Sequence, residues 1–258
     1  MNKKLITLAV AGAFAAPLVA VAADAAPTPE HSFTGNFTLA SEYIYRGIGQ
    51  TNRKPALQGG FDYAHSNGLY AGIWGSNVSW LSDFGGGISS SIELDVYGGY
   101  KGTFADDFSY DVGVLTYNYP GTFPTGFTDA DTTEVYGSLG WKWLSVKYSH
   151  VTSSHIFGWV GTNGEKTRGS GYLEMNAAFD LGEGWGVSGH VGHQKIKNFS
   201  DASYTDWKVG VTKDLGVGVV GLAYVGTNAK GDAGEPYRNP FNKDLGKDRL
   251  LLTFSKTF

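Results

Sequence analysis

The sequence predicts an all-β fold, a transmembrane antiparallel up-and-down β-barrel of about 12 strands. The first observation is the C-terminal strand, residues 248–258, in which apolar and polar residues alternate and the last residue is Phe258. A closing barrel strand ends in this way because its terminal aromatic side chain lies at the membrane interface. The second observation is an N-terminal leader, and the third is a regular alternation of long and short links between strands.

Residues 1–22 have the features of a secretory signal peptide. Lys3 and Lys4 precede an apolar run over residues 5–21, and small residues at 20–23 supply a cleavage site. An N-terminal membrane anchor is the alternative, but the run is short for spanning and contains Pro17. We therefore expect three parts: a signal peptide (1–22), a short periplasmic N-terminal tail (23–32) and one outer-membrane β-barrel (33–258).

The composition agrees with a barrel and excludes several other classes. The chain has 38 glycines, 14% aromatic residues and no cysteine, which excludes disulfides and metal–thiolate sites. The mean hydropathy of −0.18 is low because half of each barrel strand faces water. Loss of Lys3 and Lys4 with the leader makes the net charge of −4 more negative, which argues against a nucleic-acid partner.

Alternating apolar and polar residues define the strands in chain order. The third predicted segment below is aromatic and ambiguous in its facing, and the eleventh is apolar on both faces. The other ten each set one apolar face against one polar face, as a wall between lipid and water requires. The predicted strands cover residues 33–46, 56–64, 69–78, 88–101, 108–114, 134–143, 144–149, 173–181, 185–194, 206–212, 217–225 and 248–258.

The links between these strands alternate in length. The odd-numbered links are long, at residues 47–55, 79–87, 120–131, 152–169, 198–203 and 227–247. The even-numbered links are short, at residues 65–68, 102–107, 143–144, 182–184 and 215–216. Long outer loops and short periplasmic turns are typical of outer-membrane barrels. We therefore expect a protein of the cell outer membrane with both termini in the periplasm. The structural alternative is a soluble secreted barrel.

Strand direction also predicts two aromatic girdles at the membrane interfaces. At the periplasmic rim we expect Trp141, Trp143, Trp185 and Phe258. At the outer rim we expect Tyr43, Tyr45, Tyr148 and Trp207.

The polar faces of the strands supply the predicted lumen. Charged lumen residues either line a water-filled pore or form ion pairs that occlude the barrel, and the acidic excess favours cations in a pore. The candidate lumen-lining residues are Glu42, Arg46, Asp62, Glu93, Asp95, Lys101, Asp111, Glu134, Lys142, Lys147, Glu174, Asp180, Asp206 and Lys208.

The remaining motifs do not indicate a catalytic, metal or cofactor site. The glycine pattern over residues 216–221 lacks the strand–helix context of a dinucleotide fold. His190 and His193 are three apart, which places them on opposite faces of a strand. Ser188 and His190 share a face, but two residues along a strand are too far apart for a nucleophile–base pair. We therefore expect no enzyme and no cofactor.

Several separate blocks of the chain resemble the TorF family of porin-like proteobacterial outer-membrane proteins. The blocks are residues 36–47 (NFTLASEYIYRG), 58–63 (QGGFDY), 93–100 (ELDVYGGY) and 113–121 (GVLTYNYPG). The resemblance implies an outer-membrane barrel and a porin-like role. It implies no catalytic or ligand-binding residue.

The predicted function is a channel for passive diffusion of small hydrophilic solutes, with a mild preference for cations. The alternative is a non-conducting barrel with a structural, adhesive or receptor role through its outer loops. The expected partners are outer-membrane lipid, the barrel-assembly machinery and small hydrophilic solutes. The oligomeric state stays open.

Overall fold

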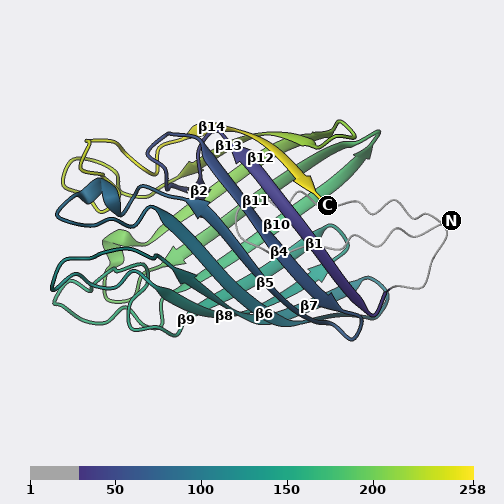
Figure 1. Cartoon of the computed structure of the whole chain (residues 1–258), viewed down its shortest axis with the longest axis horizontal. Helices are drawn as coiled ribbons and strands as arrows, with labels where there is room; N and C mark the ends of the chain where they lie inside the picture. The colour runs from purple at the N-terminus through teal and green to yellow at the C-terminus, as the bar shows by residue number, and fades with distance from the viewer. Residues whose placement is uncertain (1–28) are drawn as a thin grey trace.

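The computed structural model describes residues 29–258 and forms a closed barrel of antiparallel strands (Figure 1). Each barrel strand pairs with the next one along the chain, and β1 pairs with β14 to close the sheet. The wall consists of β1 (His31–Ala40), β4 (Ala56–His65), β5 (Leu69–Asn77), β6 (Ile92–Phe104), β7 (Phe108–Asn118), β8 (Thr132–Trp141), β9 (Leu144–Val151), β10 (Gly171–Gly182), β11 (Trp185–Lys195), β12 (Tyr204–Asp214), β13 (Val219–Thr227) and β14 (Arg249–Thr257). The predicted number of 12 strands is confirmed.

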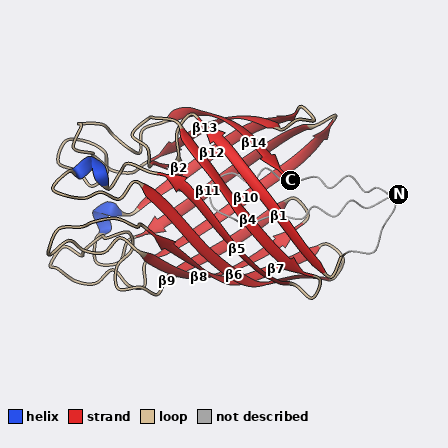
Figure 2. Cartoon of the chain, in the orientation of Figure 1, coloured by secondary structure: helices blue, strands red, loops and turns tan. Residues whose placement is uncertain are grey.

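The predicted alternation of link lengths is also confirmed (Figure 2). Links 41–55, 78–91, 119–131, 152–170, 196–203 and 228–248 gather at one end, called the loop end below. Links 66–68, 105–107, 142–143, 183–184 and 215–218 form the opposite turn end. Two short 3-10 helices lie in the long loops, η1 (Ser82–Phe84) and η2 (Ser200–Ala202). No helix within residues 29–258 is long and apolar enough to cross a membrane.

The first predicted strand is too long. β1 ends at Ala40, and residues 41–55, here called the inward segment, contain a separate small hairpin of β2 (Ile44–Tyr45) and β3 (Ile48–Gly49). In the sequence Tyr43 and Tyr45 have one parity and Glu42 and Arg46 have the other, as in a membrane strand. The physical reason for the difference is that both tyrosines lie inside the barrel, Tyr43 buried and Tyr45 half-buried, so the alternation does not report a lipid-facing wall.

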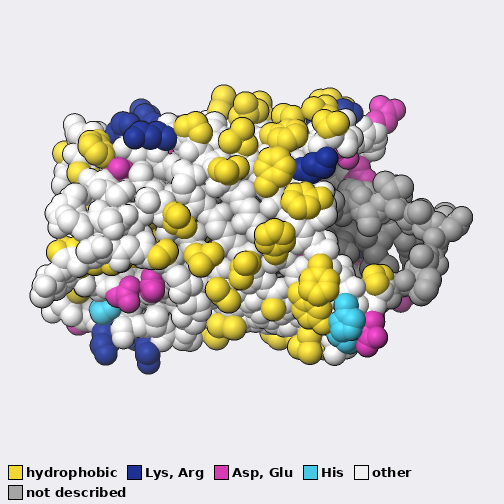
Figure 3. Space-filling model, in the orientation of Figure 1, with side chains coloured by type: hydrophobic (Ala, Val, Ile, Leu, Met, Phe, Trp, Pro, Cys, Tyr) yellow, Lys and Arg dark blue, Asp and Glu magenta, His cyan; other side chains and the backbone are white. Residues whose placement is uncertain are grey.

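The outer face of the barrel is apolar. Large hydrophobic side chains on neighbouring strands stay exposed, among them Phe61, Ile73, Val96, Leu222 and Leu252. Figure 3 shows such side chains scattered over the strand-covered part of the surface, while charged groups lie toward the two ends. Soluble monomers seldom expose so much continuous apolar surface, whereas a barrel in lipid requires it.

The C-terminus closes the barrel. β14 pairs with β1 in the register Asn36–Thr257 to Ala40–Thr253. One residue further on, the Phe258 amide donates to the Gly35 carbonyl at 2.9 Å, and the Gly35 amide donates to the Phe258 carbonyl at 2.7 Å. The Phe258 ring lies against Gly35, where an added Cβ would come within 2.6 Å of it. The two backbone hydrogen bonds of Phe258 therefore extend the β1–β14 seam by one residue pair.

Inside the barrel, tyrosines lie across glycines of adjacent strands. An added Cβ on Gly192 of β11 would approach the Tyr172 hydroxyl of β10 to 1.9 Å, and one on Gly72 would approach the Tyr97 ring to 2.5 Å. A large flat side chain needs such a gap because the wall curves around a narrow interior. This packing accounts for part of the high glycine content.

Candidate functional site: a lumen crossed by the inward segment

The inward segment turns into the lumen at a tight hairpin. β2 and β3 pair Tyr45 with Ile48, so Arg46 and Gly47 are the two turn residues. Both have positive φ angles, 44° and 79°, as a two-residue hairpin turn of type I′ requires. Gly47 also approaches the wall so closely that a Cβ there would lie 2.3 Å from Thr227 and 2.7 Å from Asp206. A side chain at residue 47 would therefore displace the hairpin from this position.

Arg46, at the tip of the hairpin, contacts the wall far from its own strand. Its guanidinium donates to both carboxylate oxygens of Glu134 on β8, at 2.9 and 2.7 Å, and to the Gln194 side chain on β11 at 2.7 Å. It also stacks over the Tyr172 ring of β10, 4.2 Å from the centroid. Bidentate pairs of this kind are strong and fix orientation. Burial lowers the pKa of Arg46, but Glu134, Tyr45 and Tyr117 together raise it well above its usual value, so the group stays charged.

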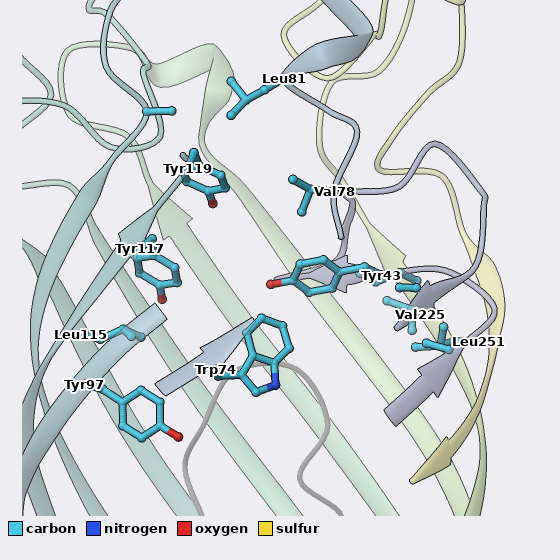
Figure 4. Packing of buried hydrophobic residues seen from close by; sticks show 14 of the residues in the cluster. Tyr43, Trp74, Val78, Leu81, Tyr97, Leu115, Tyr117, Tyr119, Val225 and Leu251 are labelled. Atoms are coloured by element: carbon cyan, nitrogen blue, oxygen red, sulfur yellow. The ribbon is translucent and has the colours of Figure 1, made fainter. Parts of the chain in front are cut away.

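Tyrosines of the inward segment bind the β6–β8 side of the wall. The Tyr43 hydroxyl donates to Glu93 at 2.7 Å, and the Tyr119 hydroxyl donates to the other oxygen of Glu93 at 2.8 Å. Tyr45 and Tyr117 share a hydrogen bond of 2.6 Å. Figure 4 shows Tyr43 reaching from one side of the lumen toward Tyr117 and Tyr119 on the other. The segment is thus bonded to β6, β7 and β8, although it follows β1.

The base of the inward segment is held by an ion pair and an apolar contact. Glu42 accepts from the Arg249 guanidinium of β14 at 2.9 Å and from the Arg53 backbone amide at 2.9 Å. Ile44 is buried in one hydrophobic cluster with inward-facing residues of β13 and β14. These residues are Ala223, Val225 and Leu251. The cluster explains why the eleventh predicted strand is apolar on both faces: its outer side chains are exposed, and its inner ones pack with the inward segment.

A second polar network lies on the β10–β12 wall. The Tyr172 hydroxyl donates to Asp206 at 2.8 Å, and Nε2 of His190 lies 2.9 Å from the same carboxylate. Nδ1 of His190 lies 2.7 Å from the Asn176 side chain, which donates to Glu174 at 3.0 Å. Both His190 nitrogens are therefore engaged, and among residues 29–258 no hydrogen bond joins His190 to Ser188.

A cavity of about 280 Å³ occupies the lumen beside the hairpin tip. It is lined by Arg46 at one side and reaches Val219 and Ser255 near the turn end. Its charged lining residues are Arg46, Asp95, Lys147, Glu174, Asp206 and Lys208. Asp95 is only 3% exposed, and within residues 29–258 its Oδ1 atom has no hydrogen-bond partner.

Most of the sequence-predicted lumen residues lie inside the barrel. Glu93, Glu134 and Asp206 are buried in the networks above. Asp62 accepts from Tyr97 and Asp111 accepts from Tyr70, each at 2.6 Å, while Lys101 and Lys147 lie over tyrosine rings. Glu42 and Arg46 are also inside, but the inward segment carries them rather than a wall strand.

Two predicted lumen residues lie elsewhere. Lys142 is in the turn 142–143, with a positive φ of 54°, and its ammonium lies 3.6 Å from Asp107 of the neighbouring turn. Asp180 is exposed at the turn end of β10, where it accepts from the Gly182 amide at 2.8 Å. Both predictions are wrong: Lys142 lies beyond the end of β8, and Asp180 lies within β10 at a register irregularity between Asp180 and Gly182, so both side chains serve turns.

Two of the predicted girdle residues are also misplaced. Tyr43 is 1% exposed and Tyr45 is half-buried, and both lie within the barrel. Their hydroxyl groups bind lumen residues, which a lipid-facing position would not allow. Trp141, Trp143, Trp185 and Phe258 are exposed near the turn end, Tyr148 is exposed toward the loop end, and Trp207 is half-buried near the loop end.

Sequence reasoning missed the tyrosines of the lumen. Tyr97 has the same parity along β6 as Glu93 and Asp95, and Tyr117 has the same parity as Asp111 along β7. This signal was present in the sequence. It was not decisive because tyrosine, with an apolar ring and a polar hydroxyl, occurs both in membrane girdles and in polar networks.

The structure defines a class: a membrane-type β-barrel with an apolar exterior, a charged lumen and an inward-folded first loop. The chain belongs to the family described as "Bacterial protein of unknown function (Gcw_chp)", which matches residues 24–258. The match carries this description and not the TorF name. No curated protein matches the chain.

Solved porin structures share the fold. The KdgM porin is similar with a TM-score of 0.53 at 9% identity, covering 87% of this chain and 98% of that one. A KdgM porin in complex with disordered oligogalacturonate has a TM-score of 0.52 at 10% identity, with the same coverage of 87% and 98%. The NanC porin has a TM-score of 0.52 at 11% identity, covering 88% and 98%. At these identities the likeness is one of fold.

Proposed function

We propose that this protein is a porin-like channel of the outer membrane, through which small hydrophilic solutes diffuse passively past the inward segment. The observation that carries the proposal is the combination of an apolar exterior with a lumen of charged and tyrosine side chains around a cavity. Barrels of this size leave space that water fills unless loops plug it. The fold shared with the KdgM and NanC porins supports the same role.

The charge of the lumen favours cationic and neutral solutes. Among the ionisable side chains inside the described part of the barrel, acidic groups outnumber basic groups. The acids are Glu42, Asp62, Glu93, Asp95, Asp111, Glu134, Glu174 and Asp206, and the bases are Arg46, Lys101, Lys147, Lys208 and Arg249. Charges that line a pore set its ionic preference. One structure of the KdgM porin is a complex with disordered oligogalacturonate, an acidic sugar chain. The acidic lumen of the present protein does not suit such an anion.

The channel proposal is tested by single-channel recording of the purified protein in a planar bilayer. We expect discrete, ohmic conductance steps and a reversal potential of cationic sign across a salt gradient. A correctly folded, heat-modifiable barrel that inserts without conductance would contradict the proposal. That outcome would favour the second candidate, a non-conducting barrel that acts through its outer loops. The hydrogen bonds by which the inward segment crosses the lumen are the observation in its favour.

Asp95→Asn tests the source of cation preference. The change keeps the shape of the side chain and removes an acidic group that lines the cavity, and the Oδ1 atom of that group is unpartnered within residues 29–258. We expect a smaller cation-to-anion permeability ratio, by about twofold, with unchanged folding. Glu165→Gln is the matched control because Glu165 is an exposed loop residue that does not line the cavity. Equal ratios in D95N and the parent protein would show that Asp95 does not act on permeating ions.

The cellular placement follows from the same proposal. We infer that the turn end and both chain termini face the periplasm, and that the long loops face outward. The barrel-assembly machinery would receive the chain through β14 and its terminal Phe258. Protease treatment of intact cells should cleave loop 152–170 and spare turn 105–107.

A further inference from the structure

A histidine pair lies at the turn end, on the part of the wall that extends beyond the C-terminus. β14 stops opposite Asn36, so residues 31–34 of β1 are paired with β4 alone. In that stretch His31 is directly opposite His65. Figure 3 shows histidine and acidic side chains side by side at this end of the molecule. The pair is open to water: His31 is exposed and His65 is partly exposed.

Glu30 completes a compact set of three metal-ligating groups. One ligand atom from each of Glu30, His31 and His65 lies within 4.8 Å of the other two. The Glu30 carboxylate is 3.6 Å from Nε2 of His65, and the two imidazole rings are 5.0 Å apart at 83°. Backbone bonds hold the set, since the Ser66 amide donates to the Glu30 carbonyl at 2.9 Å.

We propose that Glu30, His31 and His65 form a binding site for a divalent transition metal ion such as Zn²⁺. Two imidazoles and one carboxylate are ligands that Zn²⁺ takes at about 2.0–2.2 Å, and water completes its tetrahedral shell. Ligand atoms around such an ion are about 3.4 Å apart, so the side chains must close from their present spacing. Cross-strand positions fix the Cβ atoms, and exposed side chains can close the remaining distance by rotation.

The existing hydrogen bonds limit the affinity. The Asn67 amide donates to Nδ1 of His65 at 3.1 Å, and the Tyr63 hydroxyl lies 3.0 Å from Nδ1 of His31. A metal on Nε2 of His65 requires the proton on Nδ1, which releases the Asn67 amide to water. Nε2 of His31 is available without disturbing Tyr63. We therefore expect micromolar affinity, and a bound ion would link the first residues of β1 to the end of β4.

Isothermal titration of Zn²⁺ into the full chain tests the site. The chain is purified in detergent and carries no affinity tag. We expect one ion per chain, affinity reduced at least tenfold in His31→Gln and His65→Gln, and a smaller reduction in Glu30→Gln. His193→Gln is the matched control because His193 is exposed and its Nδ1 lies 3.0 Å from Thr205, with no place in the metal-ligating set. Heat-modified gel mobility shows whether each variant is folded.

Two results would overturn the proposal: no stoichiometric binding to the parent chain, or equal binding by the parent, H31Q and H65Q. The channel proposal is independent of both results because the site is at the rim of the barrel. If H65Q fails to fold, the comparison of E30Q and H31Q with H193Q still decides the outcome.

Discussion

Arg46→Ala should increase the single-channel conductance by about twofold or more. The guanidinium joins the tip of the inward segment to Glu134 and Gln194 on the opposite wall and packs over Tyr172. Without these bonds the tip has no charged anchor, and the hairpin can move away from the cavity that it borders. The released Glu134 also adds a free negative charge to the lumen, so cation preference should rise with conductance.

Arg53→Ala is the control for this experiment. Arg53 belongs to the same segment and has the same charge, but its side chain is exposed rather than buried in the lumen. The single-channel conductance of R53A should match that of the parent protein. Arg46→Lys should fall between the two, because lysine keeps the charge and loses the bidentate geometry. A lower conductance in R46A would show that the bonded hairpin holds the pore open rather than narrowing it.

Gly192→Ala should destabilise the barrel by about 1–3 kcal/mol, the usual cost of overpacking a close-fitted interior. The new methyl group would lie 1.9 Å from the Tyr172 hydroxyl and 2.3 Å from the ring carbon that carries it. Tyr172 cannot withdraw freely because it is held by Asp206, His190 and Arg46. Its displacement would break the β10–β12 network. Urea unfolding in detergent, monitored by tryptophan fluorescence, measures the decrease in the free energy of unfolding.

Gly189→Ala on the same strand separates this effect from a general intolerance of alanine. A Cβ on Gly189 meets nothing within 4 Å, and its φ lies outside the left-handed region. The free energy of unfolding of G189A should therefore lie within about 0.5 kcal/mol of that of the parent protein. An equal loss of stability in G192A and G189A would mean that alanine is unfavourable anywhere in β11. The close contact between Gly192 and Tyr172 would then not be the cause.

The exterior of the barrel could be predicted closely from the sequence. Residues such as Leu250 and Leu252 alternate with inward ones such as Leu251 and Thr253, and period-2 alternation reports which face meets lipid. The long and short links followed from turn chemistry and spacing. Both are local properties of the chain, so they can be predicted without knowledge of the tertiary structure.

The candidate site could be predicted only in part. Alternation placed Glu93, Asp95, Glu134 and Asp206 inside, but it assigned Tyr43 and Tyr45 to the membrane interface. The error arose because residues 41–46 alternate as a strand does, while the chain there leaves the wall. Nothing local distinguishes a tyrosine that faces lipid headgroups from one that binds a carboxylate across a lumen.

The class of fold, the strand number and the polarity of the two barrel faces follow from the sequence alone, because they depend on neighbours along the chain. The path of the inward segment across the lumen is visible only in the three-dimensional structure. That arrangement depends on the meeting of Arg46 with Glu134 and Gln194, which are 88 and 148 residues away along the chain. Barrel closure brings these groups together, and the burial of a paired charge then fixes the hairpin.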